Sequence, residues 1–387
     1  MAKLSRGSFR VVSSSTSQQR ILLNDFVAQW RDVRADAVAA LERVGESGWL
    51  ILGSEVKAFE AELARYWGLP EVVGCASGLD AIEIALRALG IAPGDKVLTT
   101  PLSAFATSLA IVRAGGVPVF VDVDAGGQMD LERAAEALRS DPAIKFCVPV
   151  HLFGHALDVR QLEQLAALGV QIVEDCAQAC GAASRGVPVG STGAAAATSF
   201  YPTKNLGAMG DGGALASRSA TLAAEARCLR DYGQSAKYVH AKLGMNSRLD
   251  ELQAAILRSA LLPRLPRFTQ RRVEIAEAYQ RGLSSRGLTL VPVPAGSQSV
   301  WHLFPVLVGG SREAFMAHLG QAGVASGVHY PTIIPDQPAF AGVRFECKDG
   351  LTQARRFAHT ELSLPIHPYL TDEQQQRVIE ACQRWNP

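Results

Sequence analysis

The sequence predicts an α/β fold with a large, mostly parallel sheet sandwiched by helices and a smaller C-terminal α+β domain. The first observation is that short apolar runs of strand length alternate with amphipathic, helix-length stretches between about residue 72 and residue 173. This alternation is typical of a parallel sheet whose two faces are covered by helices. The second is length, because 387 residues exceed one ordinary core and suit two domains.

Composition narrows the class of protein. Apolar residues make up 48% and charged residues 19% of the chain, a composition typical of globular proteins. The net charge of +1 gives no large positive potential that would attract nucleic acid or an anionic membrane. No apolar run reaches the roughly 18 residues of a membrane span. Seven scattered cysteines indicate reduced thiols in a cytoplasmic protein. Cys176 and Cys180 lack a second pair of similar spacing, so we expect small buried residues and no metal site.

Residues 1–20 stand apart from the rest of the chain. They are rich in serine, carry four basic residues and contain no acid. This bias resembles an organelle transit peptide, and it equally fits a disordered extension or a misassigned start. We favour a disordered extension of a cytoplasmic protein. The large domain is then expected over 21–263 and the small domain over 264–387, with a hinge at 263–266.

The elements expected in the large domain follow from periodicity and from turn residues. Phe59, Leu63 and Trp67 lie four apart on one helix face, and Gly68 ends that helix. The expected helices run to about 45 and over 56–67, 79–90, 103–114, 131–138 and 159–168, and the expected strands over 72–76, 96–99, 117–121, 145–150 and 170–173.

A strand leads directly into a helix start at Ser77-Gly78-Leu79-Asp80. The serine can cap the helix, and the aspartate stands three residues later. Free N–H groups and the positive end of the helix dipole suit a phosphate at such a point. An ordinary capped helix without a ligand has the same pattern, so this signal alone is weak.

Polar residues fall at the ends of the expected strands, where ligands bind in parallel sheets. They are Ser77, His151 and the pair Glu174-Asp175. A carboxylate at the end of an apolar strand is poorly solvated and needs a cationic partner to stay charged. A protonated pyridine nitrogen is one such partner, and a helix cap or a salt bridge is the alternative for a lone aspartate.

The stretch 198–214 contains one lysine, Lys204, followed by four glycines within seven positions. Glycines at this density mark a backbone that turns sharply or approaches a ligand closely. A partly desolvated lysine can lose its proton and attack a carbonyl carbon. A flexible surface loop with a solvated lysine remains the alternative for this stretch alone.

The rest of the chain shows fewer signals. We expect a long functional loop over 231–246, where no period is clear, and a helix over 248–262 that Pro263 stops. The other expected helices cover 222–229, 267–284, 313–321 and 373–385, and the expected strands cover 300–308 and 325–330.

Taken together, these pieces occur in the order that a pyridoxal phosphate enzyme would use. The helix start would hold the phosphate, the strand-end aspartate would keep the ring nitrogen protonated, and the lysine would hold the cofactor aldehyde as a Schiff base.

From about Ile21 to its C-terminus, the sequence resembles the DegT/DnrJ/EryC1/StrS sugar aminotransferases, a branch of the fold type I, aspartate-aminotransferase-like enzymes. The matching blocks are 52–56, 77–81, 150–154, 174–178, 199–213 and 244–253. The resemblance implies that Lys204 forms the internal aldimine and shuttles the proton between carbons of cofactor and substrate. It implies that Asp175 contacts the pyridine nitrogen and that Gln178 lies near the ring hydroxyl.

The resemblance also implies the phosphate site and the assembly. Ser199 and the backbone at Gly78 and Leu79 match the phosphate cradle, and Asn246 matches a residue contributed by the neighbouring subunit. A homodimer with active sites at the subunit interface is therefore implied. Leu79 departs from the family, where threonine is frequent, so phosphate binding must lean on Ser199, Asn246 and backbone amides.

The remaining implied positions concern the cofactor ring and the substrates. Counting four residues from Pro101 puts Phe105 where many members stack an aromatic on the pyridine ring, and a core aromatic is the alternative. Arg248 matches a residue for the carboxylate of the amino donor, and His329 and Tyr330 match a substrate-side segment.

The implied activity is a two-step, ping-pong transfer of an amino group from glutamate, or glutamine, to a keto sugar carried on a nucleotide. A cyclitol or another cyclic ketone is an alternative acceptor. A sugar dehydratase of the same fold would carry histidine at Lys204, and a non-catalytic regulatory protein would not need Lys204, Asp175 and Gln178 intact. A nicotinamide enzyme would need a G-x-G-x-x-G turn, which residues 74–78 do not supply.

Overall fold

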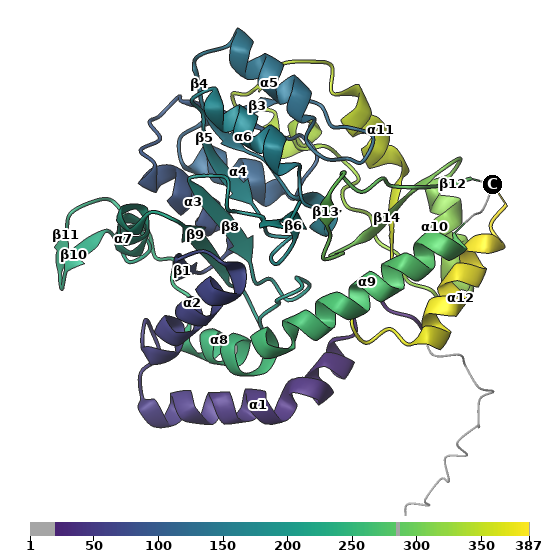
Figure 1. Cartoon of the computed structure of the whole chain (residues 1–387), viewed down its shortest axis with the longest axis horizontal. Helices are drawn as coiled ribbons and strands as arrows, with labels where there is room; N and C mark the ends of the chain where they lie inside the picture. Colours follow the sequence, from purple (N-terminus) through teal and green to yellow (C-terminus); the bar gives the residue numbers. More distant parts are fainter. Residues whose placement is uncertain (1–19, 284–286, 387) are drawn as a thin grey trace, which may run out of the picture.

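The computed structural model describes residues 20–283 and 287–386 (Figure 1). The extension expected over residues 1–20 lies outside these ranges except for Arg20. Among the helices of the described residues, none combines the length and the apolar character that a membrane crossing requires.

A large sheet of eight strands forms the centre of the molecule, as predicted. Its order is β1-β9-β8-β5-β4-β2-β3-β15, and only the contacts of β9 with β1 and β8 are antiparallel. The strands are β1 (Glu71–Cys75), β2 (Lys96–Thr99), β3 (Val117–Phe120), β4 (Ile144–Val148), β5 (Gln171–Asp175), β8 (Ala195–Ser199), β9 (Gly213–Ser217) and β15 (Glu346–Cys347).

Helices cover both faces of this sheet because successive strand residues point to opposite sides. Val97 packs with one group of helices and Leu98 with another. The first group is α3 (Gly78–Ala88), α4 (Phe105–Arg113) and α7 (Ala220–Leu229). The second group is α5 (Leu131–Ser140) and α6 (Val159–Ala167). Buried residues of α1 (Phe26–Ser47), α2 (Ser54–Trp67) and α8 (Glu251–Ile256) form a third cluster with β8 and β9.

The helical run does not stop at Pro263, contrary to the sequence prediction. After α8 it passes through a π-helical turn, Leu257–Leu261, and a 3-10 turn, Leu262–Arg264, into α9 (Leu265–Gly282). Pro263 and Pro266 each stand in the first positions of a helical segment. A proline is tolerated there because its missing N–H would have no helical partner anyway. The expected hinge is therefore a continuous, bent helical path (Figure 1).

The C-terminal part forms a small antiparallel sheet, β12-β14-β16, packed on helices. Its elements are β12 (Leu288–Leu290), β14 (Phe304–Val308), β16 (Glu361–Leu364), α10 (Arg312–Gln321) and α12 (Asp372–Gln383). The strand expected over 325–330 is only a single bridge between Gly327 and Ser363. Ile21 packs in this small cluster and β15 extends the large sheet, so the expected boundary at 263 stays a prediction.

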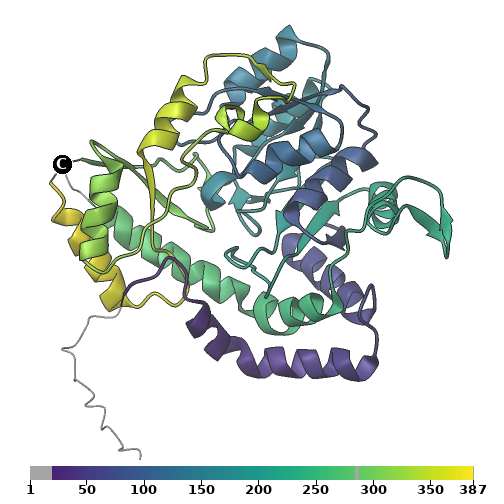
Figure 2. The ribbon, with the colours of Figure 1, turned by 180° about the vertical axis from the view of Figure 1, so that it is seen from behind.

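The remaining elements lie around these two sheets. The region expected as a long loop over 231–246 contains a hairpin, β10 (Gln234–Ala236) and β11 (Val239–His240), which projects from the body of the molecule (Figures 1 and 2). A third small sheet joins β13 (Ser297–Gln298), β6 (Ala183–Ser184) and β7 (Val187–Pro188). Helix α11 (Thr352–Thr360) precedes β16.

Candidate active site

A cavity of about 460 Å³ lies at the carboxyl ends of the central strands and is closed by segments of the C-terminal part. Eight of the residues singled out in the sequence meet there although they come from distant positions. They are Ser77, Gly78, Leu79, Asp175, Ser199, Lys204, His329 and Tyr330. The volume falls within the range of small-molecule sites.

Asp175 is the last residue of β5, and its side chain is almost fully buried in the cavity wall. One carboxylate oxygen, Oδ1, accepts a hydrogen bond from the Ala177 amide at 3.1 Å, and Oδ2 accepts one from the Thr107 hydroxyl at 2.8 Å. Burial raises the pKa of Asp175 despite these bonds and the charge of Lys204. The hydrogen bonds and Lys204 therefore do not fully offset the cost of burying the charged carboxylate. An adjacent cation would stabilise its charged form and lower its pKa.

Lys204 lies in the loop between β8 and β9 and reaches the same cavity. Burial lowers the pKa of its amine to about 8, and the charge of Asp175 partly opposes this shift. A lysine in this state has a substantial neutral fraction near neutral pH, so its nitrogen can act as a nucleophile or as a base.

The start of α3 forms the end of the cavity that suits a phosphate. Ser77 caps the helix by accepting a hydrogen bond from the Asp80 amide at 3.1 Å. The first N–H groups of a helix lack intrahelical partners, so the amides of Gly78 and Leu79 can serve a ligand. A Cβ atom at Gly78 would lie 2.7 Å from Cβ of Ser199, so the glycine lets the serine approach the helix start closely.

The cavity wall also contains His329 and Tyr330. Gln178 does not line the cavity, but its amide nitrogen donates to the Tyr330 hydroxyl at 3.1 Å. Its carbonyl oxygen accepts from the Phe153 amide at 2.7 Å. Gln178 thus holds Tyr330 in place, and its expected contact with the ring hydroxyl stays a prediction.

Three other predicted residues lie away from this cavity. Phe105 begins α4 and packs edge-on against Phe340, with ring centroids 5.5 Å apart, and its stacking on the pyridine ring stays a prediction. Asn246 is exposed. Arg248 forms an ion pair with Asp231 at 2.9 Å and lies over the Tyr232 ring.

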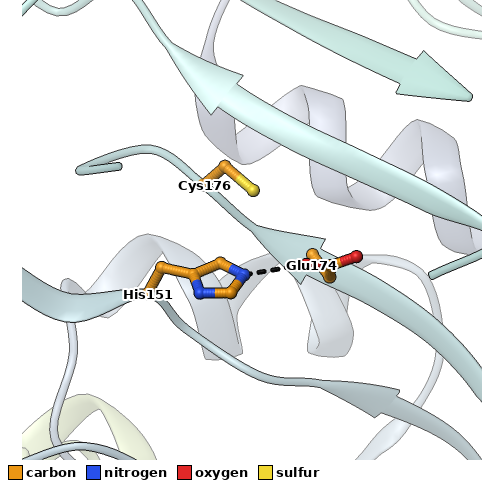
Figure 3. A group of neighbouring side chains, drawn as sticks. All are labelled: His151, Glu174 and Cys176. Atoms are coloured by element: carbon orange, nitrogen blue, oxygen red, sulfur yellow. Dashed lines mark hydrogen bonds and ion pairs between the residues drawn. The ribbon is translucent and has the colours of Figure 1, made fainter. Parts of the chain in front are cut away.

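His151, Glu174 and Cys176 form a buried cluster (Figure 3). The ligand atoms of the three lie within 4.8 Å of one another, as in a metal site. Glu174 is already saturated, because it accepts from His151 at 2.9 Å and from the amides of 190, 192 and 193. The other ring nitrogen of His151 accepts from the Leu157 amide. The cluster is thus a hydrogen-bonded anchor for the chain beside Asp175.

Sequence reasoning missed several residues that the fold brings to the site. Thr107 lies 68 residues before Asp175, and no local pattern joins the two. His302 also lines the cavity, and its ring bonds to Asn205 at 3.2 Å. The further lining residues that sequence analysis did not single out include Leu23, Asn24, Tyr201, Thr203 and Asp211. Of these residues, only Tyr201, Thr203 and Asp211 lie in the stretch 198–214, which the sequence marked as a candidate site.

The cavity fits pyridoxal phosphate. A buried carboxylate with a raised pKa suits a protonated ring nitrogen, an amine with a lowered pKa suits an aldehyde, and a helix start beside a serine suits a phosphate. The three groups lie on the wall of one cavity, as a single ligand bearing all three partners would require.

Comparison with known proteins agrees with this chemistry. The DegT/DnrJ/EryC1/StrS aminotransferase family matches residues 31–383. A dTDP-3-amino-3,4,6-trideoxy-alpha-D-glucose transaminase of Streptomyces venezuelae is 41% identical, over 97% of this chain and 98% of its own. A UDP-N-acetyl-3-dehydro-alpha-D-glucosamine 3-aminotransferase of Acidithiobacillus ferrooxidans is 38% identical, over 95% and 99%. The crystal structure of S. venezuelae DesV with a ketimine intermediate superposes with a TM-score of 0.91, at 40% identity, covering 95% of this chain and 99% of that one.

Proposed function

Because the chain belongs to the DegT/DnrJ/EryC1/StrS aminotransferase family, we propose that it moves an amino group from glutamate, or glutamine, to a keto sugar linked to a nucleotide. Pyridoxal 5'-phosphate is the cofactor of this aminotransferase. The observation that carries the proposal is that Asp175, Lys204 and the start of α3 line one cavity.

Bound pyridoxal phosphate supplies a carbon that can carry the amino group and a ring that withdraws electrons while its nitrogen is protonated. Asp175 would hold that nitrogen protonated, because a buried carboxylate is stabilised in its charged form by an adjacent cation. Ser199 and the amides of Gly78 and Leu79 would hold the phosphate.

Lys204 would act as the base and acid of the reaction. A lysine with a pKa of about 8 can accept a proton from one carbon and return it to another near neutral pH. It serves both half-reactions because donor and acceptor enter the same cavity in turn. Arg248 is proposed to bind the donor carboxylate, and His329 and Tyr330 are proposed to contact the acceptor.

The acceptor class follows from the relatives. Those described above are named for dTDP-linked and UDP-linked sugars, and both cover almost the whole chain. A nucleotide-linked keto sugar, with the amine placed to give a deoxyamino sugar, is therefore the acceptor that we propose. A screen of keto nucleotide sugars would identify the nucleotide and the position of the keto group.

We also propose a homodimer with its active sites at the subunit interface. Helix α1 and the segment 49–51 expose large apolar side chains, including Val27 at 60% and Trp49 at 62%. The projecting hairpin adds Tyr238, which is 81% exposed. Large exposed apolar side chains are typical of surfaces that associate with another chain. In such a dimer Asn246 and Arg248 could reach the partner's cavity.

A cytoplasmic location completes the proposal. All seven cysteines are free, and reduced thiols are typical of a reducing compartment.

Chemical trapping tests the site. Borohydride treatment of the purified yellow protein, followed by peptide mass spectrometry, should place a pyridoxyl group on Lys204. The Asp175→Asn variant should retain the cofactor but lose roughly 100-fold or more in turnover, since it loses a charge that stabilises the reacting ring. Labelling of another lysine, or unchanged turnover in Asp175→Asn, would refute these assignments.

A further inference from the structure

Behind His329, a chain of polar side chains leads from the cavity wall into the small domain. Nδ1 of His329 lies 2.9 Å from Oγ of Ser363. That Oγ lies 2.6 Å from Oε1 of Glu361. The second carboxyl oxygen of Glu361 accepts from the backbone amide of His329 at 2.6 Å, which closes the network. The proposed transamination uses neither Glu361 nor Ser363.

The fold builds this chain from strand geometry. Glu361 and Ser363 are two residues apart in β16, so they point to the same side of the strand. The bridge between Gly327 and Ser363 places the segment before His329 beside that strand. Leu362 and Leu364 point the other way and pack in the small-domain cluster. The alignment of the three polar groups is therefore fixed by the backbone.

The side chains at the two ends of this hydrogen-bonded series, Glu361 and His329, are both neutral near neutral pH. Glu361 is fully buried, and burial raises its pKa to about 8, although bonds from Ser363 and His329 and the charge of Arg312 oppose the shift. Burial and the charge of Lys204 lower the pKa of His329 to about 4. A protonated Glu361 can donate to Ser363, and Ser363 can then donate to Nδ1 of His329.

Four titratable or charged side chains lie around the series Glu361, Ser363 and His329. Arg312 of α10 donates to the backbone oxygen of Glu361 at 3.4 Å. Lys204 and His302 share the cavity with His329, and the charge of Lys204 contributes to the lowered pKa of His329. Tyr330 adjoins His329, and burial raises the pKa of its hydroxyl. None of these groups has a hydrogen bond to Nδ1 of His329 or to Oγ of Ser363 among the described residues, so the relay has one path.

We propose that Glu361, Ser363 and His329 form a proton relay that delivers one proton to an oxygen atom of the bound sugar. The identity of that acceptor rests on the proposed function. The remaining ring nitrogen of His329, Nε2, has no hydrogen-bond partner among the described residues, and the side chain lines the cavity. The replacement of a ketone oxygen by an amine expels that oxygen as water, which requires protons.

The transfer balances as follows. The bond from Oε1 of Glu361 to its proton breaks while one forms at Oγ of Ser363. The Ser363 proton passes to Nδ1 of His329, and the proton on Nε2 passes to the sugar oxygen. Glu361 ends as a carboxylate, His329 stays neutral in its other tautomer, and the sugar oxygen gains one proton. The relay resets when Nε2 of His329 takes up a proton from water or from an amine in the cavity, and Nδ1 returns its proton through Ser363 to Glu361.

Nitrogen NMR of the holoenzyme, labelled in its histidine rings, tests the relay without turnover. His329 is identified by the signals lost in His329→Gln. In the wild type, the His329 proton should move from Nε2 to Nδ1 as pH rises through the pKa of Glu361, about 8. Glu361→Gln should keep the proton on Nε2, because a glutamine amide can donate to Ser363 but cannot ionise. Ser363→Ala should abolish the change, and it serves if Glu361→Gln fails to fold.

The controls are internal and matched. His318 bonds to the Ala381 carbonyl at 2.8 Å, so its tautomer should not change in any variant. Glu313→Gln alters an exposed glutamate of α10 and should leave His329 as in the wild type. The relay would be overturned if the His329 tautomer did not change with pH in the wild type. It would also be overturned if the tautomer changed to the same extent in Glu361→Gln.

Single-turnover kinetics separates this inference from the proposed function. With a keto nucleotide sugar, Glu361→Gln should react about 100-fold more slowly than the wild type, the usual scale of a lost general acid. Its reaction with glutamate should stay within about 2-fold, because that half needs no proton at the sugar oxygen. Equal slowing of both halves would overturn the relay and leave the proposed function standing. If no keto sugar reacts while glutamate does, the proposed acceptor fails, and the NMR experiment still decides the relay.

Discussion

At the residue scale, the site depends on how Asp175 is held. Each of its carboxyl oxygens accepts one hydrogen bond, from the Ala177 amide and from the Thr107 hydroxyl, and Thr107 in turn lies 2.9 Å from Oγ of Ser103. Hydrogen bonds to a carboxylate favour its charged form and offset part of the cost of burial. Thr107 is therefore a positioning residue for Asp175.

The Thr107→Val change tests that role. Loss of the hydroxyl should raise the pKa of Asp175 further and lower turnover by roughly 10-fold, since a hydrogen bond to a charged group contributes about 1.5–3 kcal/mol. The absorbance of the bound cofactor should show a changed pH dependence at the same time. Ser108→Ala is the matched control, because its buried hydroxyl has no partner among the described residues. Equal behaviour of the two variants would refute the role of Thr107.

Residues whose chemistry is visible in a short stretch could be predicted from the sequence. Lys204 stands before a glycine run and Asp175 ends an apolar strand, and both line the cavity. Thr107 and Glu361 carried no such signal, because their partners come from other elements. Phe105 was assigned by counting four residues from Pro101, and its contact with Phe340 depends on a segment over 230 residues away.

At the element scale, the glycine run joins the lysine loop to the start of α3. A Cβ atom at Gly213 would collide with the backbone of Ser77 and Gly78. The glycine therefore lets β9 pass against the turn that leads into α3, which positions Ser199 beside Gly78. The sequence suggested that these glycines allow close approach to a cofactor, and at Gly213 the close approach is to the backbone at the start of α3.

Gly213→Ala should weaken cofactor binding. The added methyl group must push the start of α3 away from Ser199, so we expect the dissociation constant for pyridoxal phosphate to rise by about 10-fold or more, a cost of about 1.4 kcal/mol. Gly210→Ala is the control in the same loop, because its Cβ would meet only the flexible end of Gln253 at 3.0 Å. Fluorescence titration of the apoprotein measures both constants. Equal affinities would contradict the proposed packing role.

Strand β16 makes stability depend on pH through Glu361. A carboxyl group whose pKa rises from 4.5 to about 8 on folding stabilises the protein below pH 4.5, and this contribution is lost as pH rises toward 8. Glu361→Gln cannot ionise, so its urea midpoint should fall less than that of the wild type over this interval. The difference should be on the order of a few kcal/mol in unfolding free energy. Parallel pH curves would show that Glu361 is not protonated in the fold.

Element types were easier to predict than element ends. The strands and helices between 71 and 175 agree with the pattern because each buries a regular apolar face. The predicted helix end at Pro263 was wrong because proline also fits the first turn of a helix. The sequence alone does not show whether a proline ends one helix or begins the next. The predicted strand at 325–330 failed because only Gly327 finds a ladder partner.

At the scale of the whole molecule, the cavity is assembled from both parts of the chain. The large sheet contributes Asp175, Ser199 and Lys204, and the C-terminal part contributes His329 and Tyr330. The overall fold could be predicted because it follows from alternating elements. The packing of the C-terminal part against the sheet could not, because it rests on contacts such as the pairing of β15 with β3.

The proposed sharing of residues between subunits can be tested by mixing variants. Lys204→Ala and Asn246→Ala should each be poorly active alone. If Asn246 serves the partner's cofactor, a refolded mixture should regain activity, because the site with an intact Lys204 then receives an intact Asn246 from the other subunit. A mixture no more active than its components would place Asn246 in its own subunit's site. Wild-type protein mixed with Lys204→Ala controls for subunit exchange.

The most direct measurement follows the nitrogen of isotopically labelled glutamate into a panel of keto nucleotide sugars by mass spectrometry. The wild-type protein should transfer the label to at least one of them, replacing a ketone by a labelled amine, and Lys204→Ala should transfer none. Transfer that persists in Lys204→Ala would contradict the role of the lysine. A protein that takes the amino group from glutamate but passes it to no keto nucleotide sugar would contradict the proposed function.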